Sequence, residues 1–157
     1  MPAFRFVGIP ESLADEARAT RRSPQYGHPA VQDRAKGYGP CRVCLRTFAI
    51  GEEDRLLFTY QPHREPGDLP QPGPVFIHAE PCARYAAADF PPDFRALPIV
   101  VEGYGAGGWL VAQEAVASEP AEAVVARMFE RAGVAYAHLR NREAGCFMAR
   151  VERERAA

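Results

Sequence analysis

Apolar and polar side chains alternate along several short stretches of the chain, and such alternation predicts β-strands. Near the N-terminus it runs from Phe4 to Ile9 and stops at a proline, which indicates an opening strand. From Glu11 to Ala19 the spacing becomes helical, with Leu13 and Ala17 on one face. Residues 21–40 are polar and rich in glycine and proline, so we expect a long loop there.

The middle of the chain has a β pattern interrupted by one proline-rich segment. Residues 61–73 contain four prolines, which predicts an irregular surface loop. Pro81 precedes an alanine-rich run, and a proline in that place is typical of the first turn of a helix. The elements expected here are strands over Cys41–Ala49, Arg55–Tyr60 and Val75–His78, and a short helix over Pro81–Ala88.

The last third of the chain has the clearest pattern. Two β stretches flank the glycine-rich segment Gly105–Gly108, which predicts a hairpin. A helix follows from about Pro120, because apolar residues recur there at helical spacing. The strands expected in this part are 97–104, 109–116, 134–141 and 146–151.

These elements predict an α+β fold, namely a single domain with a mostly antiparallel sheet and two or three short helices. The sequence has no internal repeat, and no shift in composition marks a linker. We therefore expect one domain over residues 1–157, with frayed ends at 1–3 and 154–157.

Composition and charge argue against several classes of function. Hydrophobic residues make up 47% of the chain and charged residues 25%, as in ordinary globular proteins. A net charge of −1 creates no field that attracts a polyanion, so we expect no nucleic-acid partner. Apolar runs are far shorter than the roughly 20 residues that span a bilayer, and the first ten residues lack a signal-peptide core. We therefore expect no membrane partner and a cytoplasmic location. Because Gly105–Gly108 joins two strands instead of opening a helix, we also expect no nucleotide cofactor.

Two short motifs indicate a metal site. Cys41 and Cys44 form a Cys-x-x-Cys pair, and His78 and Cys82 follow after a segment predicted to be a hairpin. Thiolate and imidazole ligands suit zinc, which binds four of them in closed structural sites. A Cys-x-x-Cys turn, a hairpin and two ligands at a helix start resemble the treble-clef arrangement of small zinc domains. The sequence therefore predicts a treble-clef-like zinc site formed by Cys41, Cys44, His78 and Cys82.

Other interpretations of these cysteines stay open. In a strand, Cys41 and Cys44 would lie on opposite faces, so both reach one ion only from a turn, which Gly39 and Pro40 would allow. The 33 residues between Cys44 and His78 also form a long spacer for such a site. Cysteine is often buried as a small hydrophobe, so the thiols are alternatively core residues or a redox pair.

A second group of polar residues lies on one predicted strand. Tyr136, His138 and Arg140 alternate and therefore share a face, and Asn141 follows them. We predict that these residues bind a small anionic ligand, with Arg140 as a clamp for carboxylate or phosphate and His138 as an acid or base. Alternatively, the row is the solvent-exposed face of an antiparallel sheet.

A small thiol-dependent enzyme is the alternative function. Cys146 with His138, or Cys41 with His78, would supply a thiolate and a neighbouring base. Cys146 and His138 are therefore the candidate catalytic residues. Such an enzyme would have a cysteine whose pKa lies below the ordinary value.

Four separated segments stand out together, namely Gly39–Leu45, Gly73–His78, His138–Asn141 and Gly145–Phe147. They resemble the bacterial family catalogued as domain of unknown function 1203, and the resemblance extends from Phe4 to about Arg153. It implies a small single-domain bacterial protein without an assigned activity. Residues and resemblance together predict a binding or accessory module that structural zinc stabilises and that takes a small anionic ligand or a protein partner.

Overall fold

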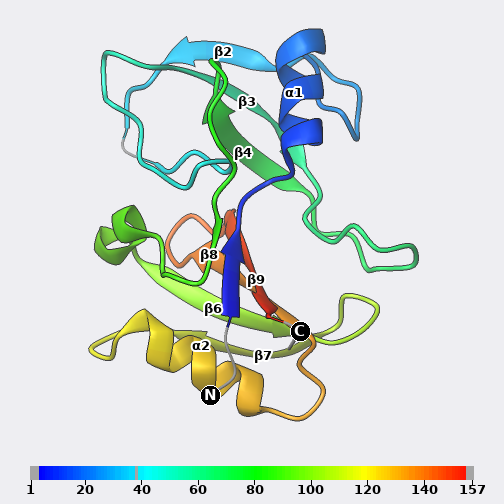
Figure 1. Cartoon of the computed structure of the whole chain (residues 1–157). Helices are drawn as coiled ribbons and strands as arrows, with labels where there is room; N and C mark the ends of the chain where they lie inside the picture. Colours follow the sequence, from blue (N-terminus) through cyan, green and yellow to red (C-terminus); the bar gives the residue numbers. More distant parts are fainter. Residues whose placement is uncertain (1–3, 38, 155–157) are drawn as a thin grey trace.

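The structure is a computed structural model that describes residues 4–37 and 39–154. Within these ranges the chain forms two antiparallel sheets, two α-helices and one 3-10 helix, η1 (Pro92–Ala96) (Figure 1). The predicted α+β class is confirmed. Of the ends expected to fray, residues 1–3 and 155–157 lie outside the described residues, and the domain extent of 1–157 stays a prediction. Every helix in the described ranges falls short of what a membrane crossing requires in length and apolar content.

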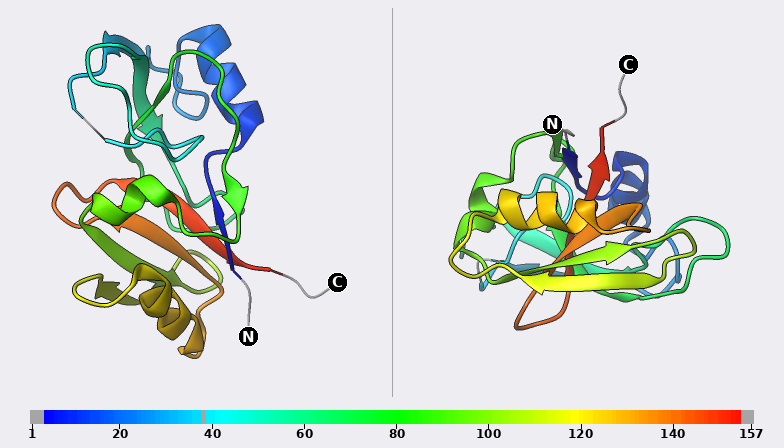
Figure 2. Two further views of the ribbon diagram at one scale, coloured as in Figure 1. Left: turned by 60° about the vertical axis from the view of Figure 1, so that its left-hand side comes forward. Right: turned by 90° about the horizontal axis from the view of Figure 1, so that it is seen from below.

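The larger sheet has six strands in the order β5-β1-β9-β8-β6-β7. They are β1 (Phe4–Val7), β5 (Ala86–Ala87), β6 (Ile99–Tyr104), β7 (Leu110–Ala115), β8 (Tyr136–Asn141) and β9 (Phe147–Arg153). Helix α2 (Ala121–Glu130) covers one face of this sheet (Figure 2). Its buried residues Val124, Val125 and Met128 pack there with apolar side chains of β6, β8 and β9. The predicted hairpin and the two closing strands are confirmed.

The smaller sheet has three strands in the order β2-β3-β4, which are β2 (Val31–Arg34), β3 (Asp54–Tyr60) and β4 (Gly73–His78). Helix α1 (Glu11–Thr20) packs Leu13 and Ala17 into the core of this sheet. The prediction of an uninterrupted loop over residues 21–40 was wrong, because β2 lies within it. This edge strand carries no apolar alternation, and Val31 is 59% exposed, so only its pairing with β3 makes it a strand.

The segment 41–49 was predicted as a strand, and this prediction was wrong. It forms a tight turn in which the N–H of Leu45 donates to the carbonyl of Cys41 at 2.9 Å. The N–H of Cys41 in turn donates to the carbonyl of Arg46 at 2.8 Å. We call Cys41–Leu45 the cysteine turn. Its consequence is that both cysteines lie on one side of the chain.

The helix predicted over residues 81–88 is also absent, since residues 81–85 form no regular element and lead into the short strand β5. The N–H of Tyr85 donates to the carbonyl of Val43 at 2.8 Å, and the carbonyl of Tyr85 accepts from the N–H of Gly8 at 2.9 Å. These long-range hydrogen bonds override the helical propensity of the alanine run.

Arg42, in the middle of the cysteine turn, connects the two sheets. Its side chain is buried, and its guanidinium donates to the carbonyls of Phe147 at 2.8 Å and Pro40 at 2.6 Å. A further Nη2 contact reaches the Cys146 sulfur at 3.1 Å. The carbonyl of Arg42 accepts from the N–H of Ile9 at 2.7 Å. The N–H of Arg42 donates to the carbonyl of Phe76 in β4 at 3.0 Å, so the cysteine turn is held to the smaller sheet as well as to β9 of the larger one.

Gly8 lies where the chain leaves β1 and passes the cysteine turn. A Cβ atom at this position would lie 2.2 Å from the carbonyl oxygen of Val43 and 2.8 Å from that of Arg42. Both neighbours are backbone atoms that hydrogen bonds hold in place, so a side chain cannot be accommodated by a rotamer change.

We therefore expect Gly8→Ala to lower the free energy of unfolding by about 3 kcal/mol or more, at the upper end of overpacking effects. Gly73→Ala is the matched control, because a Cβ there meets no atom within 4 Å. It should change stability by no more than about 0.5 kcal/mol. Denaturant unfolding of both variants measures this difference, and equal stabilities would contradict the close approach at Gly8.

Candidate metal centre

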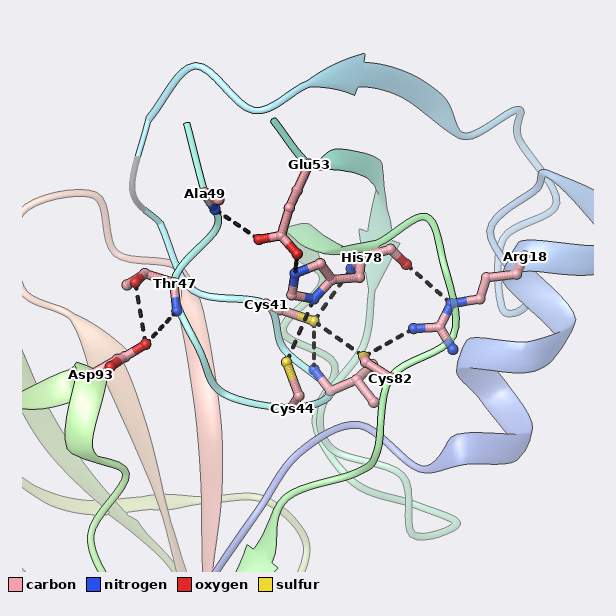
Figure 3. A network of polar contacts seen from close by, with 10 residues as sticks. Arg18, Cys41, Cys44, Thr47, Ala49, Glu53, His78, Cys82 and Asp93 are labelled. Atoms are coloured by element: carbon pink, nitrogen blue, oxygen red, sulfur yellow. Dashed lines mark hydrogen bonds and ion pairs between the residues drawn. The ribbon is translucent and has the colours of Figure 1, made fainter. Parts of the chain in front are cut away.

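Three sulfurs and one imidazole converge between the cysteine turn and the end of β4 (Figure 3). Their ligand atoms all lie within 4.8 Å of one another. Three of the residues are buried and the fourth is half-buried. The four ligand residues are those predicted from the sequence, namely Cys41, Cys44, His78 and Cys82. Within the described residues, this cluster can hold a metal ion.

The distances within the cluster fit one tetrahedral ion. Bond lengths of about 2.3 Å to sulfur and about 2.05 Å to nitrogen put two sulfurs about 3.8 Å apart and a sulfur and a nitrogen about 3.5 Å apart. The sulfurs of Cys41 and Cys82 are 3.8 Å apart. The sulfur of Cys44 and Nδ1 of His78 are 3.5 Å apart. These two distances therefore match edges of a coordination tetrahedron.

The cysteine turn explains how two thiols three residues apart reach one point. Leu45 has a φ of +60°, and this left-handed conformation reverses the chain directly after Cys44. The cost of that conformation is offset by burial, because Leu45 is only 1% exposed in the core beneath the larger sheet. Backbone N–H groups of Val43 and His78 point at the Cys41 sulfur, at 3.4 and 3.3 Å. Such contacts stabilise a thiolate.

Residues around the cluster orient the ligands. Nε2 of His78 lies 2.9 Å from a carboxylate oxygen of Glu53, which leaves Nδ1 for the metal. This is the usual carboxylate partner of a metal-bound histidine. Nη2 of Arg18 lies 3.2 Å from the Cys82 sulfur, and Arg46 lies against the sulfur of Cys44. Two positively charged guanidinium groups therefore lie beside the three sulfurs of the cluster.

These surrounding residues were not found from the sequence. Arg18 belongs to α1, and Glu53 lies in the turn before β3, so neither has a fixed spacing from the cysteines. Glu53 is hard to identify from the sequence as a partner of the ligands, because it is one of several acidic residues in an ordinary turn. The backbone of Thr47 is held by Asp93 at 2.9 Å, which ties the chain after the cysteine turn to η1.

Protonation differs among the ligands in the metal-free fold. Burial, and then the neighbouring thiols of Cys44 and Cys82, raise the pKa of the Cys41 thiol. Contacts first with Cys41 and then with Cys82 hold the pKa of Cys44 well below its usual value. Contact with the Cys44 sulfur, followed by that with Cys82, raises the pKa of His78 to about 10. At neutral pH, His78 and Cys41 therefore both carry a proton that a metal ion must displace.

The residues of the predicted anion-binding row do not lie on a solvent-exposed face of the sheet. Tyr136, His138 and Arg140 share one face of β8, and all of them are buried. Nε of Arg140 lies 2.6 Å from a carboxylate oxygen of Glu102. The hydroxyl of Tyr136 lies 2.7 Å from Nδ1 of His63. The solvent-exposed alternative was therefore wrong, because the proline-rich loop and the smaller sheet cover this face.

The side chain of Asn141 accepts hydrogen bonds from nearby backbone N–H groups. Its side-chain oxygen accepts the N–H groups of Glu143 and Ala144 at 2.9 and 2.8 Å, which closes the turn between β8 and β9. The guanidinium of Arg140 also donates to the carbonyl of Gly145 at 2.8 Å in the same turn. A ligand-binding role for Tyr136, His138, Arg140 and Asn141 stays a prediction.

The two thiol–base pairs of the alternative enzyme are not formed by direct hydrogen bonds. Both ring nitrogens of His138 are buried without a partner among the described residues, so Cys146 does not reach them. Cys146 instead accepts from Arg42. Nδ1 of His78 lies nearest the sulfur of Cys44, while Cys41 accepts from the backbone N–H of His78. Catalysis by Cys146 and His138 stays a prediction.

Comparison with known proteins gives one match. A family model described as "Protein of unknown function (DUF1203)" matches residues 38–153. No curated protein and no solved structure matches the chain. The matched region contains all four ligand residues of the metal centre and the strands β3 to β9.

We expect Glu53→Gln to weaken metal binding by about 10- to 100-fold, because the imidazole loses its charged partner while an oxygen remains for the N–H of Ala49. Glu52→Gln is the matched control at the neighbouring exposed position and should leave the affinity unchanged. Competition with a chromophoric chelator measures both. Equal affinities in the two variants would contradict the orienting role of Glu53.

Metal binding should release at least two protons per ion at neutral pH, including one from His78 and one from Cys41. Since the raised pKa values keep these protons on the metal-free protein, the apparent affinity should fall as the pH is lowered and rise as it increases. Each released proton contributes about a tenfold change per pH unit. Calorimetric titration in buffers of different ionisation enthalpy counts the protons, and a buffer-independent binding enthalpy would contradict this expectation.

Proposed function

The chain belongs to the DUF1203 family of proteins of unknown function, and we propose that it is a binding module stabilised by one structural zinc ion. The supporting observation is that the four ligand atoms lie within 4.8 Å of one another, with two separations of 3.8 and 3.5 Å that match the edges of a tetrahedral site. A tetrahedral site with three sulfurs and one imidazole suits zinc better than the harder divalent cations.

A structural role for the metal is supported by the number and burial of its ligands. Four protein ligands complete a tetrahedron and leave no position for water or substrate, whereas catalytic zinc sites have three protein ligands. Glu53, Arg18 and Arg46 surround the cluster and restrict access to it. In this proposal zinc polarises no reacting group.

The metal would connect segments that are separate in the sequence. Cys41 and Cys44 lie in the cysteine turn, His78 ends β4, and Cys82 lies in the irregular segment before β5. Zinc would hold these segments together, and the hydrogen bond from Arg42 to the carbonyl of Phe147 would connect them to β9. Structural zinc contributes about 10–16 kcal/mol in small peptides, so the folded state would depend on it.

The cellular setting in this proposal is the cytoplasm, because thiolate ligands must stay reduced and reducing compartments keep them so. All four cysteines are free, which is compatible with that environment. The partner in this proposal is a small anionic ligand or another protein. A net charge of −1 favours neither nucleic acid nor an anionic membrane surface.

We expect purified protein to contain about one zinc ion per chain and to lose stability when a strong chelator removes it. Cys44→Ala removes one of four ligands and should cost about 5 kcal/mol or more, which lowers Tm by about 10–20 °C. Elemental analysis and thermal unfolding measure both effects.

Cys146→Ser is the control for this experiment, because Cys146 lies outside the ligand cluster. It should keep its zinc and its sensitivity to the chelator. A wild-type protein that is metal-free, stable and indifferent to the chelator would rule out the zinc proposal.

A further inference from the structure

A cavity of about 150 Å³ lies at the junction of the two sheets, away from the metal ligands. Its lining includes Val7 and Gly8 at the end of β1, Tyr60 at the end of β3, and Phe147 at the start of β9. The rings of Tyr60 and Phe147 are 5.6 Å apart and form an aromatic wall. In Figure 1 the segment after β1 runs between the two sheets at this junction.

Three arginines from distant parts of the sequence line this cavity. Arg64 belongs to the proline-rich loop, Arg84 to the segment before β5, and Arg150 to β9. Nε of Arg84 donates to the carbonyl of Gly8 at 2.9 Å, which fixes the guanidinium at the cavity rim. In the part of the chain that the structure describes, neither Arg64 nor Arg84 forms an ion pair.

Among these three arginines, Arg150 has a side chain that two neighbouring residues hold in place. Its guanidinium lies 4.0 Å from the centre of the Tyr136 ring, and its Nε lies 2.9 Å from a carboxylate oxygen of Glu152. Glu152 and Glu65 also line the cavity, so the lining has one net positive charge. Burial raises the pKa of Tyr60, while Arg64, Arg150 and Arg84 act in the opposite direction. All three positive charges are therefore close enough to influence one phenol oxygen.

The size of the cavity restricts what it can hold. An apolar cavity of about 150 Å³ accommodates a benzene molecule, which has six heavy atoms. A tetrahedral oxyanion such as phosphate, or a short carboxylic acid, has a similar number of heavy atoms. Guanidinium groups bind such oxyanions through charge-assisted hydrogen bonds.

We propose that the cavity lined by Arg64, Arg84 and Arg150 is a binding site for a small oxyanion of the phosphate or carboxylate class. Arg84 and Arg64 bind the anion directly, and Arg150 contributes from its place above Tyr136. The site lies beside the predicted row on β8 but uses different guanidinium groups, since Arg140 is engaged by Glu102. This inference rests on the anion-binding part of the proposed function and is independent of the zinc ion.

The test is calorimetric titration of the intact, folded chain as purified with inorganic phosphate, sulfate and malonate at low chloride concentration. Binding of phosphate or sulfate alone assigns a phosphate-type ligand, and binding of malonate assigns a carboxylate. Arg84→Gln and Arg64→Gln should each weaken binding by about tenfold, or about 1.4 kcal/mol. Arg64 is exposed, so Arg64→Gln leaves the fold intact even if Arg84→Gln does not.

Two further variants sharpen this experiment. Glu152→Gln removes a repelling carboxylate and frees Arg150, so it should tighten anion binding several-fold. Arg131→Gln makes the same charge change as Arg64→Gln at an exposed position after α2 and should have no effect. A folded protein that binds none of the three anions would overturn the site, as would an equal loss in Arg131→Gln. Failure of the zinc proposal would appear separately, in the metal content and Tm.

Discussion

Arg42 joins the two sheets of this protein, because its backbone N–H donates to the carbonyl of Phe76 in β4 and its buried guanidinium donates to that of Phe147 in β9. A positive charge in the interior is costly unless its donors are satisfied. Here two backbone carbonyls, those of Phe147 and Pro40, and the sulfur of Cys146 receive its N–H groups. Burial lowers the pKa of Arg42, and the sulfurs of Cys146 and Cys41 oppose that shift. The same residue occupies the second position of the Cys-x-x-Cys pair, so the metal centre and the sheet junction share one piece of backbone.

The two faces of the larger sheet differ because different elements cover them. One face is covered by α2 and is apolar, whereas the other contains Glu102, Tyr104, Tyr136, His138 and Arg140. A polar row is ordinarily left in water, but here the proline-rich loop adds His63 and Gln71 as hydrogen-bond partners. Buried polar groups of this kind are stable only when most are satisfied, which specifies one relative position of the loop and the sheet.

The sequence predicted well those features that depend on local pattern. The hairpin of β6 and β7, helix α2 and the strands β8 and β9 follow from alternation, helical spacing and turn residues. The four ligand residues could be identified because cysteine and histidine are chemically distinctive and their pairs are close in sequence. Features that depend on distant partners were missed. The segment 81–88 has helical composition, but its backbone is bound by Val43 and Gly8. The polar strand β2 exists only as a partner of β3, and Glu53 and Arg18 meet the cluster only after folding.

The strand order has a consequence for biosynthesis. β1 pairs with β5 on one side and with β9 on the other, so the larger sheet stays incomplete until the ribosome has released residues 147–153. All four ligand residues lie between positions 41 and 82 and emerge much earlier. Under the zinc proposal, the nascent chain would bind the ion and form the smaller sheet before β9 is available to pair with β1. Until then one edge of β1 has no partner, and an unpaired strand edge is prone to pair with other chains.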